Sequence, residues 1–216
     1  MFLGEVTFSN IQHYEITGDK KNDISNLEKA VSESDIIMIG EDHNDYYVEQ
    51  FVKLAAKLMK PDYFLTEHTQ WLDVHYSELS KRIIGLGRDG LPMNKFTGKL
   101  LKNLKDINFK GTVIGMDYDP TSSPVKLPRE KVFERVVYSD EYSIPESFKL
   151  REVYMLQAVR KYGVPHNKIL VQVGDSHLRS TSSSFFGPPS PLITGLQFSG
   201  LKISYFRLLS KYREVQ

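Results

Sequence analysis

Two apolar segments that end in the same short pattern constrain the fold of this chain more than any other feature. Residues 36–39 are followed by Gly40-Glu41-Asp42-His43, and residues 169–173 by Gly174-Asp175-Ser176-His177. An apolar run of four or five residues that stops at a glycine is typical of a buried strand in a parallel sheet. Side chains two apart on an extended chain share a face. The pattern therefore predicts, twice, a carboxylate and an imidazole aimed together at the end of a strand.

Strand and helix patterns alternate along the rest of the chain. Further strands are expected at residues 63–66, 112–116 and 201–208, with one or two short strands or a hairpin within 3–16. Helices are expected at residues 23–32, 45–59, 73–84, 94–104 and 145–162, the first capped by Asn22 or Asp23. Residues 181–191 are rich in Ser, Gly and Pro and predict a flexible loop. The alternation indicates an α/β fold, a single domain over 1–216 with a central, mostly parallel sheet flanked by helices.

Ionisable residues follow four of the expected strands, and open α/β sheets bind ligands at the carboxyl ends of their strands. The pairs are Glu41/His43, Glu67/His68, Asp117/Asp119 and Asp175/His177. Some have simpler explanations. Glu41 and Asp175 could cap a helix, His68 would point away from Glu67, and the Asp-Pro step at 119–120 is an ordinary turn signal. The site is nevertheless expected at this edge of the sheet.

Composition excludes several classes of site and partner. The chain has no cysteine, which removes disulfides, cysteine nucleophiles and thiolate metal sites. A formal net charge of +1 gives no reason to expect nucleic acid or an anionic membrane as a partner. The N-terminal residues lack the pattern of a signal peptide, and no run of about 18 apolar residues could span a membrane. We therefore expect a cytoplasmic protein without nucleic-acid or membrane partners. The oligomeric state stays open.

The ordered set of motifs resembles the superfamily that groups the Tiki and TraB-type proteins, the ChaN-like haem-binding proteins and the erythromycin esterases. The elements in question are Gly40-Glu41-x-His43, Glu67, Arg151-x-x-x-Met155 and Gly174-x-x-His177. Two Gly-x-x-His motifs, a glutamate and an arginine mark the Tiki and TraB branch. A Gly-Glu start is typical of the other two branches. The matched elements extend from about residue 35 to 179.

Each branch implies a different activity at the strand ends of an α/β sheet. The Tiki branch implies a metal-dependent hydrolase or peptidase. The esterase branch implies a histidine general base that opens an ester or lactone without an obligatory metal. The ChaN branch implies haem binding, for which Tyr46, Tyr47 or Tyr118 could supply a ligand. A fold kept only for protein interaction is a further alternative.

The leading hypothesis is a hydrolase of a peptide or ester bond that activates water at a His/Glu site. His43, His177, Glu67 and Arg151 are the expected catalytic residues, with Arg151 stabilising an oxyanion or orienting Glu67. Glu41, His43, Glu67 and His177 are the expected ligands of one divalent metal ion, which the donor set restricts to manganese, cobalt, zinc or iron. Without a metal, a histidine oriented by a carboxylate would deprotonate the water. The expected partner is a small-molecule or peptide substrate.

Overall fold

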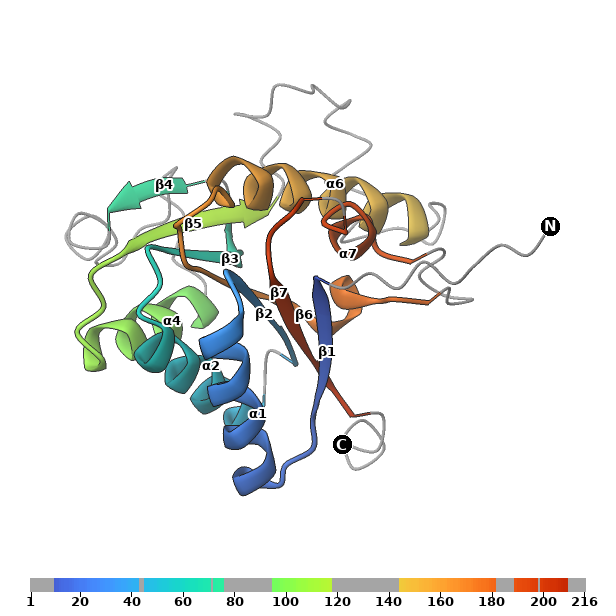
Figure 1. The fold of residues 1–216 in the computed structure, drawn as a ribbon. Coiled ribbons are helices and arrows are strands. Elements are labelled where there is room, and N and C mark those ends of the chain that lie inside the picture. Colours follow the sequence, from blue (N-terminus) through green and yellow to red (C-terminus); the bar gives the residue numbers. More distant parts are fainter. Residues whose placement is uncertain are drawn as a thin grey trace.

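A seven-stranded sheet forms the centre of the molecule (Figure 1). The computed structural model describes residues 10–42, 45–70, 72–75, 95–117, 144–181, 189–197 and 199–209, with the backbone alone at 68–70, 72–75, 95–98, 117 and 144–150. The strands are β1 (Ile11–Ile16), β2 (Ile36–Glu41), β3 (Tyr63–Gln70), β4 (Leu72–His75), β5 (Thr112–Asp117), β6 (Ile169–Gly174) and β7 (Ile203–Leu208). Their order in the sheet is β1-β7-β2-β6-β3-β5-β4.

Six of these strands run parallel, and β4 pairs antiparallel with β5 at one edge. The predicted α/β class with a mostly parallel sheet is therefore confirmed. The prediction of a helix at residues 73–84 is wrong for residues 73–75, which belong to strand β4. The remainder of that segment lies outside the described residues. Near the N-terminus, β1 pairs with β7 in parallel, so residues 11–16 are one strand of the main sheet.

Helices cover both faces of the sheet (Figure 1). On one face lie α1 (Lys20–Glu33), α2 (Tyr46–Met59) and α4 (Lys95–Asp106); on the other lie α6 (Ile144–Tyr162) and α7 (Pro191–Thr194). A short 3-10 helix, η1 (Asp175–Leu178), continues directly from β6. Among the described helices, none is long and apolar enough to cross a membrane.

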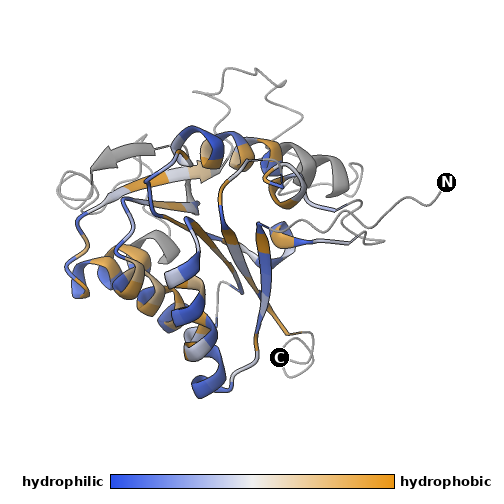
Figure 2. Cartoon of the chain, in the orientation of Figure 1, coloured by the Kyte–Doolittle hydropathy of each residue, from blue (hydrophilic) through white to orange (hydrophobic). Residues whose placement is uncertain are grey.

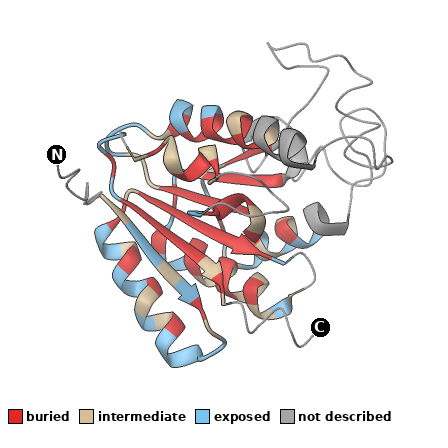
Figure 3. Ribbon diagram, turned by 90° about the vertical axis from the view of Figure 1, so that its right-hand side faces the viewer, coloured by how far each residue is buried: buried red, intermediate tan, exposed pale blue. Residues whose placement is uncertain are grey.

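The central strands are buried on both faces, which explains their unbroken apolar sequence. In β2, Ile37 and Ile39 pack in the core with α1, α2 and α4, while Ile36 and Met38 pack in the core with α6 and α7. Figure 2 shows the hydrophobic colour concentrated on these strands and on the helix sides that face them, and Figure 3 shows the same strands buried. Burial of this kind favours folding by about 25 cal/mol for each Å² of apolar surface.

Side-chain caps fix where the first two helices begin. Asp45 accepts hydrogen bonds from the backbone N–H groups of Tyr47 and Val48 and so starts α2. For α1 the cap is Asp19, not Asn22 or Asp23 as expected. Asp23 is buried inside the helix instead, where its carboxylate accepts hydrogen bonds from the N–H groups of the loop before α1. Two carboxylates therefore act at the start of α1: Asp19 caps the helix and Asp23 binds the preceding loop. The sequence pattern did not distinguish these two roles.

Candidate active site

The four strands with ionisable ends are neighbours in the sheet. They lie in the order β2-β6-β3-β5, so their carboxyl ends form one continuous edge. The register places Glu41 of β2 opposite Gly174 of β6. The two Gly-x-x-His motifs therefore lie at the same edge of the sheet, as the sequence predicted, and they follow adjacent strands with their glycines offset by one residue.

His177 lies in η1 with its ring between two carboxylates. Only 2% of the residue is exposed. Nδ1 is 3.2 Å from Oε1 of Glu152, and Nε2 is 3.2 Å from Oε2 of Glu67. Ionised carboxylates can only accept hydrogen bonds, so both ring nitrogens face acceptors. This is the arrangement of a histidine held for proton transfer or held as a cation.

Glu67 reaches this imidazole from the end of β3. The β3–β5 register shifts after Thr66, and the residue that follows is largely buried. The backbone N–H of Gly174 donates to Oε1 of Glu67 at 2.7 Å, and a guanidinium nitrogen of Arg151 lies 3.7 Å from Oε2. Arg151 comes from α6 and is partly exposed. Three of the predicted catalytic residues, Glu67, Arg151 and His177, are thus brought together.

Two further members of this cluster, Glu152 and Arg179, were not among the residues predicted from the sequence. Glu152 is fully buried on α6, next to Arg151. Its Oε1 lies 3.0 Å from one guanidinium nitrogen of Arg179, and its Oε2 accepts from the other at 3.3 Å. A sequence signal for Glu152 did exist, since it shares helical spacing with Met155 and Val159 and so places a carboxylate in the apolar face of α6.

The surroundings of the ring favour its charged form. Burial alone lowers the pKa of His177, and the charge of Arg151 also lowers it. The charge of Glu67 and the hydrogen bonds with Glu152 and Glu67 act in the opposite direction and prevail, so the pKa of His177 lies above its ordinary value of 6.5. The raised pKa therefore favours an imidazolium in contact with two carboxylates.

Asp175, the acid of the second motif, is not directed toward the same site as His177, contrary to the prediction. Asp175 accepts the backbone N–H of Leu208 at 2.8 Å and forms an ion pair with Arg207 at 2.8 Å, both on β7. The reason is local: after Gly174 the chain forms a 3-10 helix, where each residue turns by about 120°, so side chains two apart diverge. Asp175 neither caps this helix nor faces His177. It fastens the end of β6 to β7.

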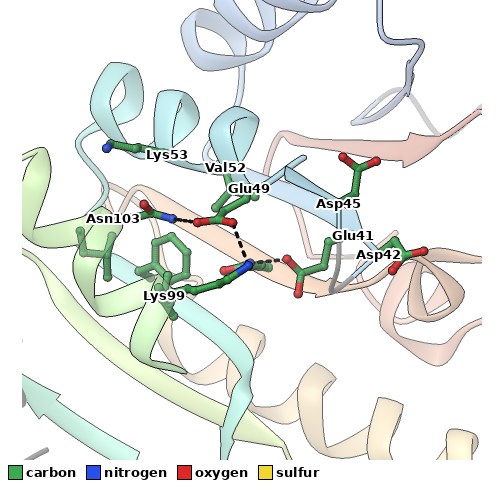
Figure 4. A pocket seen from close by; sticks show the side chains of 12 residues that line it. Glu41, Asp42, Asp45, Glu49, Val52, Lys53, Lys99 and Asn103 are labelled. Carbon is green, nitrogen blue, oxygen red and sulfur yellow. Dashed lines mark hydrogen bonds and ion pairs between the residues drawn. The ribbon is translucent and has the colours of Figure 1, made fainter. Parts of the chain in front are cut away.

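The acid of the first motif lies on the opposite face of the sheet from His177. Glu41 accepts a hydrogen bond from Gln172 and lines a cavity of about 30 Å³ below α2 and α4. Figure 4 shows this cavity, with Glu49 held by Asn103 and Lys99 at its rim. A volume of this size accommodates a water molecule. His43, the predicted partner of Glu41, lies outside the described residues.

The described residues that were predicted to bind one metal ion lie on opposite faces of the sheet. Glu41 belongs to the face with α2 and α4, whereas Glu67 and His177 meet beside α6. Across the part of the chain that the structure describes, no three His, Asp or Glu side chains converge as a metal site. The described donors therefore do not fit the four-ligand metal centre expected from the sequence, and the chemistry below uses no metal.

The remaining candidates contribute less to this edge. Tyr47 uses its hydroxyl to donate to Asp23, and Tyr46 is 72% exposed. His68 and Asp117 are described by their backbone alone, while Tyr118 and Asp119 lie outside the described residues. Of the tyrosines predicted as possible haem ligands, Tyr47 is thus engaged with Asp23 and Tyr46 is exposed to solvent.

The sequence matches no protein-family model and no curated protein. Distant structural similarity is found to several solved structures. The haem-binding ChaN of Campylobacter jejuni is 14% identical, with 88% of this chain and 86% of that chain covered and a TM-score of 0.49. RRSP, a MARTX toxin effector domain from Vibrio vulnificus, is 15% identical, with a TM-score of 0.46. The type III effector HopBA1 is 16% identical, with 77% of each chain covered and a TM-score of 0.43.

The match to RRSP covers 84% of this chain but only 39% of the RRSP chain. The similarity to ChaN and the effector domains is one of fold alone. The chemistry of the site therefore has to be derived from the residues of this chain.

Proposed function

We propose that this protein is a hydrolase of ester or peptide bonds that activates water with His177 and Glu67. The observation that carries the proposal is the buried imidazole whose two nitrogens each face a carboxylate, at the carboxyl edge of a parallel sheet. Ionisable groups with perturbed pKa values in such positions are candidates for catalysis. The substrate would be a small molecule or a peptide.

We assign the two proton-transfer roles to Glu67 and His177. The Glu67 carboxylate would accept the proton of the attacking water, and the His177 imidazolium would donate its Nε2 proton to the leaving oxygen or nitrogen. Return of the proton from Glu67 to Nε2, across the 3.2 Å that separate them, restores the resting site. Each proton removed from water is thus matched by one given to the leaving group.

Arg151 supports this step through its charge. Its guanidinium lies 3.7 Å from Oε2 of Glu67 and favours the ionised carboxylate. Because the Arg151 side chain keeps one fifth of its surface exposed, it is also the member of the cluster that can meet a carbonyl oxygen of an incoming substrate. There it would stabilise the negative charge that develops when water adds.

A panel of chromogenic esters and short peptides tests the proposal, with wild-type protein dialysed against a chelator. Glu67→Gln keeps the shape of the side chain and removes the base, so we expect hydrolysis to fall by about 10²- to 10⁴-fold. Glu49→Gln is the matched control, because Glu49 is also hydrogen-bonded but lies at the other face. Full activity of Glu67→Gln would contradict the proposal.

Two other outcomes of the same panel are informative. Activity that disappears on dialysis and returns with manganese, cobalt or zinc would restore the metal-dependent form of the hypothesis. The absence of hydrolysis, together with a Soret band when haem is added, would replace the hydrolase by the haem-binding alternative.

A further inference from the structure

We propose that Glu152, clamped by Arg179, is the positioning residue of His177: it holds one proton on Nδ1 and leaves Nε2 as the nitrogen that exchanges a proton. This inference rests on the proposed function, since it gives the imidazole a fixed working nitrogen. It concerns two residues, Glu152 and Arg179, that have no part in the water-activating steps themselves.

The burial of Glu152 is the first observation. A carboxylate with no exposed surface is costly unless charged or polar groups surround it. Glu152 meets this requirement with His177 at 3.2 Å and Arg179 at 3.0 Å, both on Oε1, and with Arg179 again on Oε2. A carboxylate with contacts at both oxygens has little freedom to rotate, so Oε1 of Glu152 stays directed at Nδ1 of His177.

Arg179 ties this carboxylate to the turn that carries the histidine. It lies two residues after His177, and one of its guanidinium nitrogens also donates to the backbone carbonyl of Ser176. The residue is 5% exposed. Arg179 thus links α6, through Glu152, to Ser176, the residue before His177 in η1, which restrains the ring relative to Glu67.

The two carboxylates at the ring differ in their arginine contacts. Both oxygens of Glu152 contact Arg179, at 3.0 and 3.3 Å, and Glu152 has no exposed surface. A guanidinium nitrogen of Arg151 lies 3.7 Å from Oε2 of Glu67, whose Oε1 accepts from the N–H of Gly174. The hydrogen bond at one ring nitrogen decides which tautomer a histidine adopts. We therefore assign the permanent proton to Nδ1, the nitrogen that faces Glu152.

Nitrogen-15 NMR of the imidazole rings measures this assignment directly in the full-length protein without substrate. At a pH above the midpoint of its own titration, His177 of the wild type should carry its proton on Nδ1. A wild-type ring protonated on Nε2, or one that stays doubly protonated up to pH 9, would overturn the proposal. The wild-type spectrum decides this by itself, whatever the variants do.

The double variant Glu152→Met/Arg179→Met sharpens the test. Replacing both members of a buried ion pair by apolar side chains of similar size is often tolerated, whereas removing one leaves a buried charge unpaired. Glu67 then becomes the carboxylate that attracts the ring proton, so the neutral ring should switch to Nε2–H. A double variant that folds and keeps Nδ1–H would refute the role of Glu152. Glu49→Gln, the control, should leave the His177 spectrum unchanged.

Failure of this inference is separable from failure of the proposed function. A protein that hydrolyses no substrate but shows the Nδ1–H ring and its switch keeps Glu152 as the positioning residue and loses the hydrolase proposal. An active hydrolase with an Nε2–H ring does the reverse.

Discussion

The two Gly-x-x-His motifs are nearly equal in sequence and adjacent in space, yet they end in different environments. Both follow apolar strands of the same sheet, with Glu41 directly opposite Gly174. Glu41 remains on an extended strand and receives a hydrogen bond from the amide of Gln172, beside a small cavity. Asp175 begins a 3-10 helix and binds β7. One short pattern therefore supports two structures, and the backbone conformation after the glycine decides between them.

The second motif also separates its own acid from its own histidine. Asp175 has a structural role at β7, while His177 meets acids from β3 and α6. The two carboxylates that contact His177 are therefore supplied by tertiary structure, from β3 and α6, and not by its own motif.

Substitution of the two motif acids should give the largest difference in the free energy of unfolding. Asp175→Asn removes a charge-assisted contact with Arg207 and should lower the free energy of unfolding by about 2 kcal/mol. Glu41→Gln alters a hydrogen bond with a neutral amide and should cost less than about 1 kcal/mol. Urea denaturation of both variants measures the difference. Equal losses would remove the distinction drawn between the two motifs.

The two glycines should respond unequally to the same substitution. A Cβ at Gly40 would lie 2.7 Å from Oδ1 and 3.0 Å from Cα of Asp175, so backbone must move, and Gly40→Ala should cost about 2 kcal/mol. A Cβ at Gly174 would meet Oε1 of Glu67 at 3.0 Å, and that side chain can rotate away. Gly174→Ala should therefore be the milder variant in thermal unfolding. A Gly174→Ala loss larger than that of Gly40→Ala would show that the Glu67 side chain cannot yield.

The histidine of the second motif should leave a pH signature in stability. Its folded pKa lies above the unfolded value of 6.5, so its contribution is complete below pH 6.5 and is lost as the pH rises through the folded pKa. Relative to His177→Gln, the wild type should lose at most about 1.4 kcal/mol of unfolding free energy for each pH unit in that window. Chemical denaturation at several pH values measures this slope.

His13 provides an internal contrast with the opposite sign. Burial and the charge of Arg207 lower the pKa of His13, so its contribution to stability is lost as the pH falls from 6.5 through the folded pKa. The effect of His13→Gln should therefore change with pH below 6.5, whereas that of His177→Gln changes above it. A wild-type advantage over His177→Gln that grows above pH 6.5 would contradict the contacts assigned to this ring.

Much of the fold could be predicted from the sequence, because buried strands and helices have a recognisable spacing of apolar residues. The unbroken apolar runs of β2 and β6 and the helical spacing of α2 and α6 predicted those elements to within one or two residues. The position of β7 between β1 and β2 could not be predicted, because strand order depends on packing between distant segments. The same holds for β4, because its pairing with β5 joins distant segments, and the polar character of residues 73–84 did not indicate it.

The site was predictable where a residue ends a strand and less so elsewhere. Glu67 and His177 follow apolar runs, and the structure places them in contact. Helical spacing could have placed Glu152 on the apolar face of α6, but its contact with His177 depends on how α6 packs against η1, which no local pattern reports. The direction of Asp175 was mispredicted because the rule for extended chains does not apply to a 3-10 turn.

The most direct test of the account compares His177→Gln with Asp175→Asn on the best ester or peptide substrate, with folding of each variant checked by circular dichroism. Because the imidazole transfers the proton and Asp175 only fastens β6 to β7, we expect kcat/KM to fall by about 10³-fold in His177→Gln and to stay within about tenfold of wild type in Asp175→Asn. Undiminished hydrolysis by His177→Gln, or an equal loss in a folded Asp175→Asn, would contradict the central claim that His177 is the catalytic member of this motif.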